Sequence, residues 1–485
     1  MARTDLVATK ANGNGAVENG AENLKNNLKQ QQQQKGKLSS TQLIALEDQH
    51  AAHNYHPLPV VFDRALGAKV WDPEGNEYID MLSAYSAVNQ GHCHPRIIGA
   101  LIAQAQKLTL SSRAFHNSVM GVWAEKMTTL FGYDMVLPIN TGAEAVESAI
   151  KLARKWAYTV KRVPEGTAIV LSVEGNFHGR TVGVVSMSTD PTARTGFGPF
   201  LPGVGPTFVD PETGSEKVIR FGEISDVERA FELYSSRIAA FLVEPIQGEA
   251  GINVPSPGYL PAVAALCKKH NILLICDEVQ TGLGRTGRLL ASDHSNIRPD
   301  MILLGKALSG GAYPVSAVLA DKSVMLSIKP GEHGSTYGGN PLGCAVSIAA
   351  LQVLIDEDLS ARADRLGNLF RTKVKELNSP YITTVRGLGL LNAIVVDEDA
   401  CNASRARRGL DITRKRTAWQ FCLLLKEKGV LAKTTHGNVV RFAPPLVIEE
   451  ADLLRAVQII GECLVDLEAR DEVPEEGEED DVLEN

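Results

Sequence analysis

Short apolar segments alternate with helix-like stretches between about residues 86 and 345, and this alternation constrains the fold more than any other feature. The segments predicted to be strands are residues 135–139, 168–173, 238–243, 272–276 and 301–304. They are apolar along their whole length, which is typical of strands buried on both faces of a parallel sheet. Since helical stretches separate them, we predict an α/β fold with helices covering a mostly parallel sheet.

The pattern changes after about residue 359. Helical periodicity there covers residues 361–378, 417–428 and 451–467, and residues 382–396 have the alternation of strands. The long, basic stretch at 397–416 is predicted to be an exposed surface insertion. We predict five parts: a disordered N-terminal extension (1–37), an N-terminal segment belonging to the small domain (38–85), a large domain (86–358), a smaller α+β domain (359–470) and an acidic disordered tail (471–485).

The two ends differ in composition from the rest of the chain. Residues 1–37 are rich in Asn, Gln, Gly and Ala and lack apolar periodicity, so they cannot bury enough surface to offset the entropy of ordering. They resemble neither a secretion signal nor an arginine-rich presequence, which makes the cytosol the expected location. Nine of the last fifteen residues are acidic, and they account for the net charge of −8. No nucleic-acid partner is expected, and the apolar runs are too short for a membrane span.

Three patterns suggest chemistry that we do not expect here. The seven cysteines form no C-x-x-C pair, so reduced, mostly buried thiols are predicted. The sequence H-C-H at residues 92–94 lacks a third ligand at a recognisable spacing, which favours local hydrogen bonding over a metal site. The sequence G-L-G-R-T-G at residues 282–287 matches a dinucleotide motif, but no long apolar-periodic helix follows it. It also lacks the Lys and Ser/Thr of a P-loop.

Two charged residues follow neighbouring predicted strands, at the edge where open α/β sheets bind ligands. Asp277 comes directly after the strand at 272–276, and Lys306 follows the strand at 301–304. Burial of either charge is costly unless the group is paired or reactive. A structural ion pair is the alternative interpretation of Asp277.

The sequence N-T-G-A-E at residues 140–144 has the spacing of a capping box at the start of a helix. Gly142 and Ala143 could present free N–H groups to a phosphate there, although a helix start that binds nothing is the alternative. Together with Asp277 and Lys306, such a phosphate site is the set of groups that pyridoxal phosphate requires. The lysine binds the cofactor covalently, and the acid keeps the ring nitrogen protonated.

Six short motifs resemble those of the class III, fold-type I pyridoxal-phosphate aminotransferases. They are N-T-G (140–142), F-H-G-R (177–180), E-P-I-Q-G-E (244–249), D-E-V-Q (277–280), G-K-A (305–307) and G-S-T-Y-G (334–338). The resemblance covers roughly residues 40–467. Three further stretches are most similar to family members that act on ornithine: residues 54–59, 83–95 and 441–445.

The resemblance implies a reaction and a cofactor. L-Ornithine and 2-oxoglutarate would give L-glutamate 5-semialdehyde and L-glutamate by a ping-pong route. Pyridoxal 5′-phosphate would alternate between its aldehyde and amine forms. Such a reaction belongs to arginine and ornithine catabolism and to the interconversion of proline and glutamate. The family also implies a homodimer, or a higher homo-oligomer, with shared active sites.

The resemblance further implies which residues bind the cofactor: Lys306, Asp277, Phe177, Gln280, Gly142, Ala143, Ser335 and Thr336. Lys306 would hold the cofactor and move the proton, and Asp277 would pair with the ring nitrogen. Phe177 would cover the ring, and Gln280 would hydrogen-bond its phenolic oxygen. Thr336 would reach the phosphate from the neighbouring subunit. His178 stands where some relatives would have a bulky aromatic residue, and its role is open.

The residues implied to bind substrate are Tyr55, Tyr85, Arg180, Glu249 and Arg441. Tyr55 and Arg180 would hold the α-amino and α-carboxylate ends of ornithine, and Tyr85 would line the same pocket. An arginine exposed beside the δ-amine would repel that amine. We therefore hypothesise that Glu249 neutralises Arg441 while ornithine reacts and releases it for a dicarboxylate. A static ion pair is the alternative.

Three other functions compete with this hypothesis. The nearest is another ω-aminotransferase, acting on 4-aminobutyrate or N-acetylornithine, against which Tyr55 and Tyr85 argue. A pyridoxal-phosphate decarboxylase or aminomutase would share Asp277 and Lys306 but would transfer no amino group to 2-oxoglutarate. A non-catalytic scaffold would predict a broken site, whereas Lys306, Asp277 and Arg180 are all present.

Overall fold

The computed structural model describes residues 38–473, so the predictions for residues 1–37 and for most of the acidic tail lie outside the described residues. The described chain forms two compact units, and each is considered by itself. One unit comprises residues 38–64 and 71–76, and the other comprises residues 65–70 and 77–473. Among the described residues, no helix is long and apolar enough to cross a membrane.

The first unit contains α2 (Ser40–His50) and a turn at residues 72–76. Ser39 and Gln42 form a capping box, in which Gln42 N donates to Ser39 Oγ and Ser39 N donates to Gln42 Oε1. The helix ends at His50 because Ala51 takes an extended backbone conformation. Ser40 N also donates to Glu74 Oε1 at 2.7 Å, which ties the helix to the turn.

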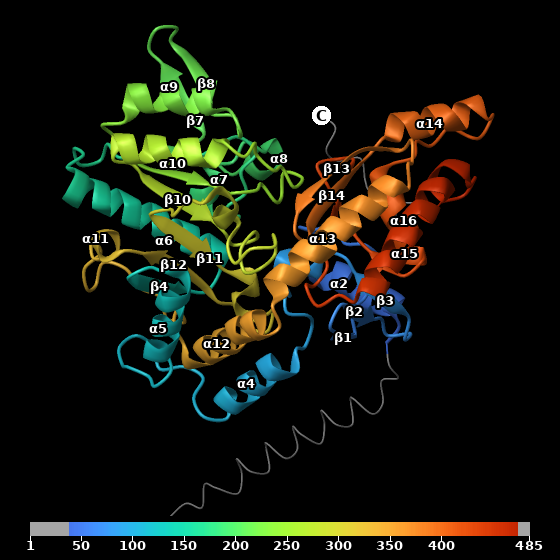
Figure 1. Cartoon of the computed structure of the whole chain (residues 1–485), viewed down its shortest axis with the longest axis horizontal. Coiled ribbons are helices and arrows are strands. Elements are labelled where there is room, and N and C mark those ends of the chain that lie inside the picture. The colour runs from blue at the N-terminus through green and yellow to red at the C-terminus, as the bar shows by residue number, and fades with distance from the viewer. Residues whose placement is uncertain (1–37, 474–485) are drawn as a thin grey trace, which may run out of the picture. The chain divides into compact units, whose positions relative to one another are not determined.

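A seven-stranded sheet forms the centre of the second unit, shown in Figure 1. In spatial order its strands are β4 (Met135–Ile139), β12 (Ser316–Ala320), β11 (Met301–Leu304), β10 (Leu273–Asp277), β9 (Ile238–Val243), β5 (Ile169–Leu171) and β6 (Val204–Gly205). All five predicted strands belong to this sheet. Only β12 runs antiparallel to its neighbours. The α/β fold with a mostly parallel, helix-covered sheet is therefore confirmed.

Helices bury their apolar faces against this sheet. The helix α6 (Gly142–Trp156) packs on β9, β11 and β12 through a face that includes Val146, Ala149 and Ile150, which form part of the main hydrophobic core. Other helices of this part are α4 (Pro95–Ala105), α5 (Met120–Phe131), α9 (Ile224–Tyr234), α10 (Tyr259–His270) and α12 (Pro341–Asp356). Burial of these apolar faces is the main favourable contribution to the stability of such a layered fold.

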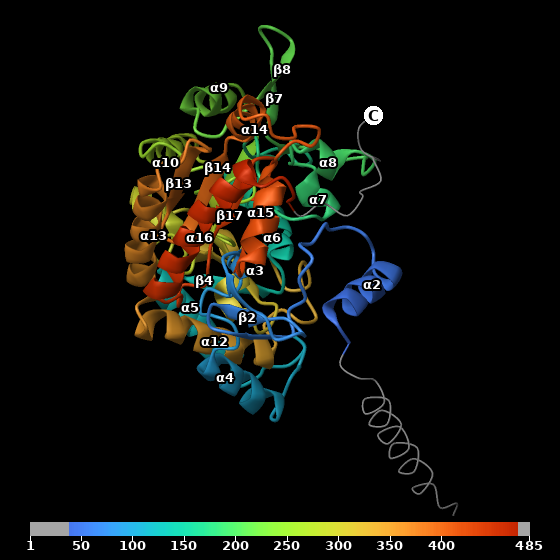
Figure 2. The ribbon, with the colours of Figure 1, turned by 90° about the vertical axis from the view of Figure 1, so that its right-hand side faces the viewer.

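The C-terminal part adds an antiparallel sheet in the order β13 (Ile382–Leu388), β14 (Leu391–Val396), β17 (Val439–Phe442) and β16 (Lys433–Thr435). The helices α13 (Leu359–Glu376), α15 (Ala418–Glu427) and α16 (Glu450–Ala469) lie side by side in Figures 1 and 2. The strand β3 (Glu77–Asp80) pairs in parallel with β15 (Val430–Leu431), which joins an early segment to this C-terminal part. The predicted boundaries near residues 86, 359 and 471 stay predictions.

The prediction of an exposed insertion at residues 397–416 is wrong in part. Residues Glu398–Arg407 form α14, and Arg405 is fully buried. Its guanidinium donates to the carbonyls of Glu468, Arg470 and Asp411 at 2.6–2.8 Å. Basic composition predicted exposure because it cannot distinguish an arginine in water from one that satisfies carbonyls in the interior.

Two smaller predictions concern cysteine and histidine. Six of the seven cysteines are buried and only Cys93 is exposed, which confirms mostly buried thiols. Both histidines of the H-C-H sequence form hydrogen bonds, with a different carboxylate for each imidazole, and the partner of His94 is distant in sequence. His92 Nε2 lies 2.8 Å from Asp80 Oδ2, and His94 Nε2 lies 3.0 Å from Glu357 Oε1.

Gly389, between β13 and β14, provides a test of how closely the segments of the second unit pack. Its φ is +53°, and an added Cβ would lie 2.3 Å from the backbone carbon of Thr286. Gly409 has a φ of +70° with nothing within 4 Å of an added Cβ. We expect Gly389→Ala to lower the free energy of unfolding by about 3 kcal/mol or more and Gly409→Ala by only about 1 kcal/mol. Urea denaturation measures both, and equal losses would contradict the close approach at Gly389.

Candidate active site

A cavity of about 170 Å³ lies where the carboxyl ends of β4, β9, β10 and β11 meet. These four strands point in the same direction, so the residues that follow them gather at one edge of the sheet. The cavity is lined by Gly142, Ala143, Phe177, His178, Gly179, Glu244, Glu249, Asp277, Val279, Gln280, Thr281 and Lys306. The structure therefore brings seven of the predicted site residues together.

Asp277 is the last residue of β10 and is 5% exposed. One carboxylate oxygen, Oδ2, lies 2.7 Å from His178 Nδ1, and the other accepts the N–H of Val279 at 3.1 Å. Burial lowers the pKa of the His178 imidazole, but the hydrogen bond to Asp277 and the charges of Asp277 and Glu244 outweigh it, so that this pKa is raised. His178 thus gives the buried Asp277 carboxylate a hydrogen-bonding partner inside the protein.

Glu244 adds a second buried carboxyl group beside this pair. It follows β9, and it accepts the N–H groups of Phe177 at 3.0 Å and Gly248 at 3.2 Å. Burial raises the pKa of Glu244 to about 7, and the charge of His178 opposes this shift. The Glu244 carboxyl group therefore changes its charge near neutral pH, and it lies close enough to Asp277 for the two to interact electrostatically.

Lys306 lies at the start of a short 3-10 helix after β11, with a φ of +46°. This left-handed conformation is strained for a residue with a side chain, and such strain occurs preferentially at functional sites. Burial lowers the pKa of the Lys306 amine, although the nearby carboxylates pull it in the other direction. A larger fraction of the amine is therefore uncharged, and able to act as a nucleophile or base, than at an exposed lysine.

The first turn of α6 forms one wall of the cavity. The predicted capping box is present, because Thr141 Oγ1 accepts from Glu144 N and Glu144 Oε2 accepts from Thr141 N. Gly142 lies so close to Val279 that an added Cβ would be 2.8 Å from Val279 Cγ1. The N–H groups at this helix start lack hydrogen-bond partners within the helix, and the helix dipole gives this end a partial positive charge. Both properties favour the binding of an anion.

The polar atoms that line the cavity match the chemical groups of pyridoxal phosphate. Gln280 Oε1 is buried and accepts no hydrogen bond among the described residues, although an unsatisfied buried acceptor is costly. A ligand hydroxyl would satisfy it. The lysine amine, the buried Asp277 carboxylate and the start of α6 all line the same cavity. These are the groups that the aldehyde, the ring nitrogen and the phosphate of this cofactor would need.

A larger cavity of about 590 Å³ lies next to this one, and Glu249 lines both. Arg180, Phe177 and His436 also line the larger cavity. The Arg180 guanidinium carbon lies 5.3 Å from the centre of the Phe177 ring. The larger cavity is lined on one side by the segment at residues 188–193. Its volume is enough for a small organic substrate next to the first cavity.

Arg441, on β17, forms an ion pair with Glu249, with 2.6 Å between Nη1 and Oε2. Its side chain is 5% exposed, and Nε is buried without an acceptor among the described residues. The guanidinium carbon also lies 4.8 Å from the centre of the Tyr85 ring. Glu249, Arg441 and Tyr85 therefore form one cluster at the edge of the cavity.

Five predicted residues line neither cavity: Tyr85 and Arg441, which form the cluster with Glu249, and Tyr55, Ser335 and Thr336. Tyr55 belongs to the first unit, so its contact with the site stays a prediction. Ser335 Oγ accepts from Asn140 Nδ2 at 3.0 Å and from Gly338 N at 2.9 Å, and it lines a separate cavity. Thr336 is exposed.

Two functional groups of this site received no role from the sequence. His178 was noted, but its hydrogen bond to Asp277 could not be foreseen, because 99 residues separate the two. Glu244 was quoted only as part of a motif. The available signal was its position directly after the apolar strand at 238–243, the same signal that identified Asp277.

Comparison with known proteins gives consistent matches along most of the chain. The family model of the class-III aminotransferases matches residues 50–464. The ornithine aminotransferase of Schizosaccharomyces pombe is 56% identical over 436 residues, covering 90% of this chain and 96% of that protein.

Two solved structures illustrate the range of similarity. The crystal structure of the ornithine aminotransferase from Toxoplasma gondii has a TM-score of 0.81 at 44% identity, covering 95% of this chain and 99% of that one. The acetylornithine aminotransferase from Elizabethkingia anophelis has a TM-score of 0.76 at 50% identity, covering 88% of this chain and 100% of that one.

The buried Glu244 predicts a pH dependence of stability. Its pKa is about 7 in the folded protein, against an ordinary value of 4.5, so the folded state binds more protons between these pH values. The stabilisation of the folded state by this bound proton is fully present below pH 4.5 and is lost as the pH rises through 7. Relative to Glu244→Gln, the cofactor-free wild type should lose on the order of 3 kcal/mol of unfolding free energy between pH 4.5 and 8. Urea denaturation at several pH values measures this, with Glu174→Gln as an exposed control. Parallel curves for wild type and Glu244→Gln would contradict the prediction.

Proposed function

The chain belongs to the class-III aminotransferases, and we propose that it catalyses the δ-transamination of ornithine. L-Ornithine and 2-oxoglutarate would give L-glutamate 5-semialdehyde and L-glutamate. The observation that carries this proposal is the ion pair between Arg441 and Glu249 beside Lys306, because it masks a carboxylate-binding arginine. A pocket that takes both a diamine with one carboxylate and a dicarboxylate needs such a masked arginine.

Pyridoxal phosphate is the cofactor, and when bound it supplies an aldehyde that takes up the amino group and a ring that withdraws electrons from the carbon losing a proton. Lys306 holds the cofactor and carries the proton at its Nζ atom. Its buried position favours the uncharged amine, which can accept that proton. Asp277, held by His178, would pair with the ring nitrogen. Gly142 and Ala143 hold the phosphate with their N–H groups.

The chain's own residues decide which amino group reacts. Arg180 holds the α-carboxylate of ornithine in the larger cavity, and Tyr55 holds the α-amino group. The δ-amine then points to Lys306. Since Glu249 neutralises Arg441 in this state, the δ-amine meets no net positive charge from the arginine. When a dicarboxylate binds, Glu249 releases Arg441, whose unpaired Nε and freed Nη1 then hold the second carboxylate.

A homodimer completes the proposed site. Thr336 is exposed and lies outside the cavity of its own subunit, which supports a role in binding the phosphate of the neighbouring subunit, next to Ser335. The cytosol is the location expected of this enzyme.

A second candidate is transamination of N-acetylornithine, which the similarity to the acetylornithine aminotransferase from Elizabethkingia anophelis favours. An acetylated α-amine cannot donate to the hydroxyl of Tyr55 as a free ammonium group does. Free ornithine is therefore the substrate that the proposed contacts favour, over both N-acetylornithine and 4-aminobutyrate.

The substrate is tested by offering L-ornithine, N-acetylornithine and 4-aminobutyrate separately to the holoenzyme. We expect ornithine to remove the visible absorption band of the bound cofactor fastest, by a factor of at least about ten, because only ornithine has both groups that Arg180 and Tyr55 hold. The semialdehyde is trapped to identify the product. Lys306→Ala should lack the band of the wild type and produce no semialdehyde. Faster reaction of either other amine would overturn the assignment to ornithine.

The masking of Arg441 is tested with Glu249→Ala. Without the carboxylate, the arginine stays positive in both half-reactions, so the variant should slow the half-reaction of ornithine by about tenfold to a hundredfold and favour the α-amino reaction of glutamate. Single-turnover rates of each half-reaction measure this change. Glu174→Ala, an exposed residue that lines the larger cavity, is the matched control. An unchanged preference between ornithine and glutamate would show a static ion pair instead.

A further inference from the structure

A left-handed turn carries Tyr85 into the cluster with Arg441. Ser83, Ala84, Tyr85 and Ser86 have φ values of +48°, +47°, +59° and +71°. The left-handed conformation is disfavoured for each of these residues, because Cβ approaches the following carbonyl oxygen. Four in succession persist only where the surroundings hold them.

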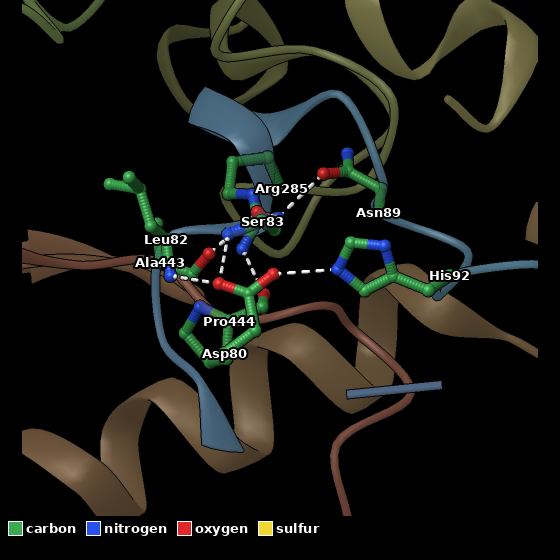
Figure 3. A network of polar contacts seen from close by, with 8 residues as sticks. All are labelled: Asp80, Leu82, Ser83, Asn89, His92, Arg285, Ala443 and Pro444. Atoms are coloured by element: carbon green, nitrogen blue, oxygen red, sulfur yellow. Dashed lines mark hydrogen bonds and ion pairs between the residues drawn. The ribbon is translucent and has the colours of Figure 1, made fainter. Parts of the chain in front are cut away.

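Asp80 and Ser83 hold the start of this turn, as Figure 3 shows. Asp80 Oδ1 accepts the N–H groups of Leu82 at 2.8 Å and Ser83 at 2.9 Å, and Asp80 Oδ2 lies 2.8 Å from His92 Nε2. Ser83 Oγ donates to the carbonyl of Ala443 at 2.6 Å. That bond ties the turn to the chain directly after β17, two residues beyond Arg441.

Arg285 joins three distant segments at the same point. It belongs to the G-L-G-R-T-G sequence at residues 282–287, and it is fully buried. Its Nη2 donates to Ser83 Oγ at 2.9 Å and to Asn89 Oδ1 at 2.6 Å, and its Nη1 donates to the carbonyls of Pro444 at 2.6 Å and Leu390 at 3.0 Å. The planar guanidinium thus fixes four acceptors in one arrangement.

This network holds the two chain segments that carry Tyr85 and Arg441. On one side it holds the left-handed turn that carries Tyr85, and on the other it holds residues 443 and 444, which follow Arg441 on β17. The Arg441 guanidinium carbon lies 4.8 Å from the centre of the Tyr85 ring, and the bonds of the network are made outside the cavity.

We propose that Arg285 and Ser83 are positioning residues for substrate binding: their hydrogen bonds fix Tyr85 against Arg441 and so set the affinity of the site for the carboxylate that Arg441 binds. Neither residue lines the cavity. The proposal rests on the proposed function, because it takes Tyr85 and Arg441 to contact the substrate. A misplacement of about 1 Å in such a contact can cost up to about a hundredfold in rate or affinity.

The direct variant, Arg285→Ala, would leave four buried acceptors unpaired and can prevent folding. Ser83→Ala is the sharper test, since it removes only the bonds to Arg285 and Ala443. Ser86→Ala is its matched control: it removes a hydroxyl from the same left-handed turn, but Ser86 Oγ is buried and has no hydrogen-bond partner among the described residues.

The holoenzymes are compared by KM and kcat for ornithine and 2-oxoglutarate, and by calorimetric titration with glutarate, an unreactive dicarboxylate. We expect Ser83→Ala to raise the KM for 2-oxoglutarate and the Kd of glutarate by about tenfold, while kcat changes by less than about twofold. Ser86→Ala should leave all three within about twofold of the wild type. A merely structural role would lower the amount of active protein, and with it the apparent kcat, without moving KM or Kd.

Two outcomes would overturn the inference. One is an equal effect, or no effect, of Ser83→Ala and Ser86→Ala on KM and Kd. The other is a full additional effect of Ser83→Ala in a Tyr85→Ala background, because a residue that acts through Tyr85 loses its effect there. Failure of the proposed function is distinguishable from both. It would appear as wild-type protein that forms no semialdehyde from ornithine, while the glutarate titration still tests the positioning.

Discussion

The hydrogen bond between His178 Nδ1 and Asp277 Oδ2 is the interaction on which the site depends, because it keeps a charge at the end of a sheet that is otherwise apolar. Strand β10 buries all five of its residues, and burying a carboxylate without a partner at its end would be costly. The imidazole removes that penalty. With this partner in place, Asp277 presents a carboxylate at the sheet edge, and it contributes to the pKa shifts of Glu244 and Lys306.

The central sheet could be predicted because its strands are short apolar runs with helices between them. Strand β12 (Ser316–Ala320) was not predicted, since its five residues include a serine and two alanines and look like part of a loop. The capping box at Thr141 and Glu144 is purely local and was predicted correctly. Local rules of this kind need only neighbouring residues, which a sequence displays directly.

The interior arginines could not be predicted. Arg285 and Arg405 are fully buried. Each donates to two backbone carbonyls of segments far away in sequence: Leu390 and Pro444 for Arg285, and Glu468 and Arg470 for Arg405. Neither composition nor spacing indicates which carbonyls a fold leaves without partners. The left-handed turn at residues 83–86 was missed for a related reason: S-A-Y-S contains no glycine or asparagine, and only the tertiary network makes its conformation acceptable. Long-range polar contacts decide the arrangement around Tyr85 and Arg441, whereas local signals indicated Asp277, Lys306 and the start of α6.

Glu249 lines both cavities, and this shared position has a consequence for how the product leaves the site. A molecule that leaves the inner cavity through the outer one passes the same carboxylate that covers Arg441. A change at Glu249 would alter product exit together with substrate choice, so the two properties are tuned by one side chain.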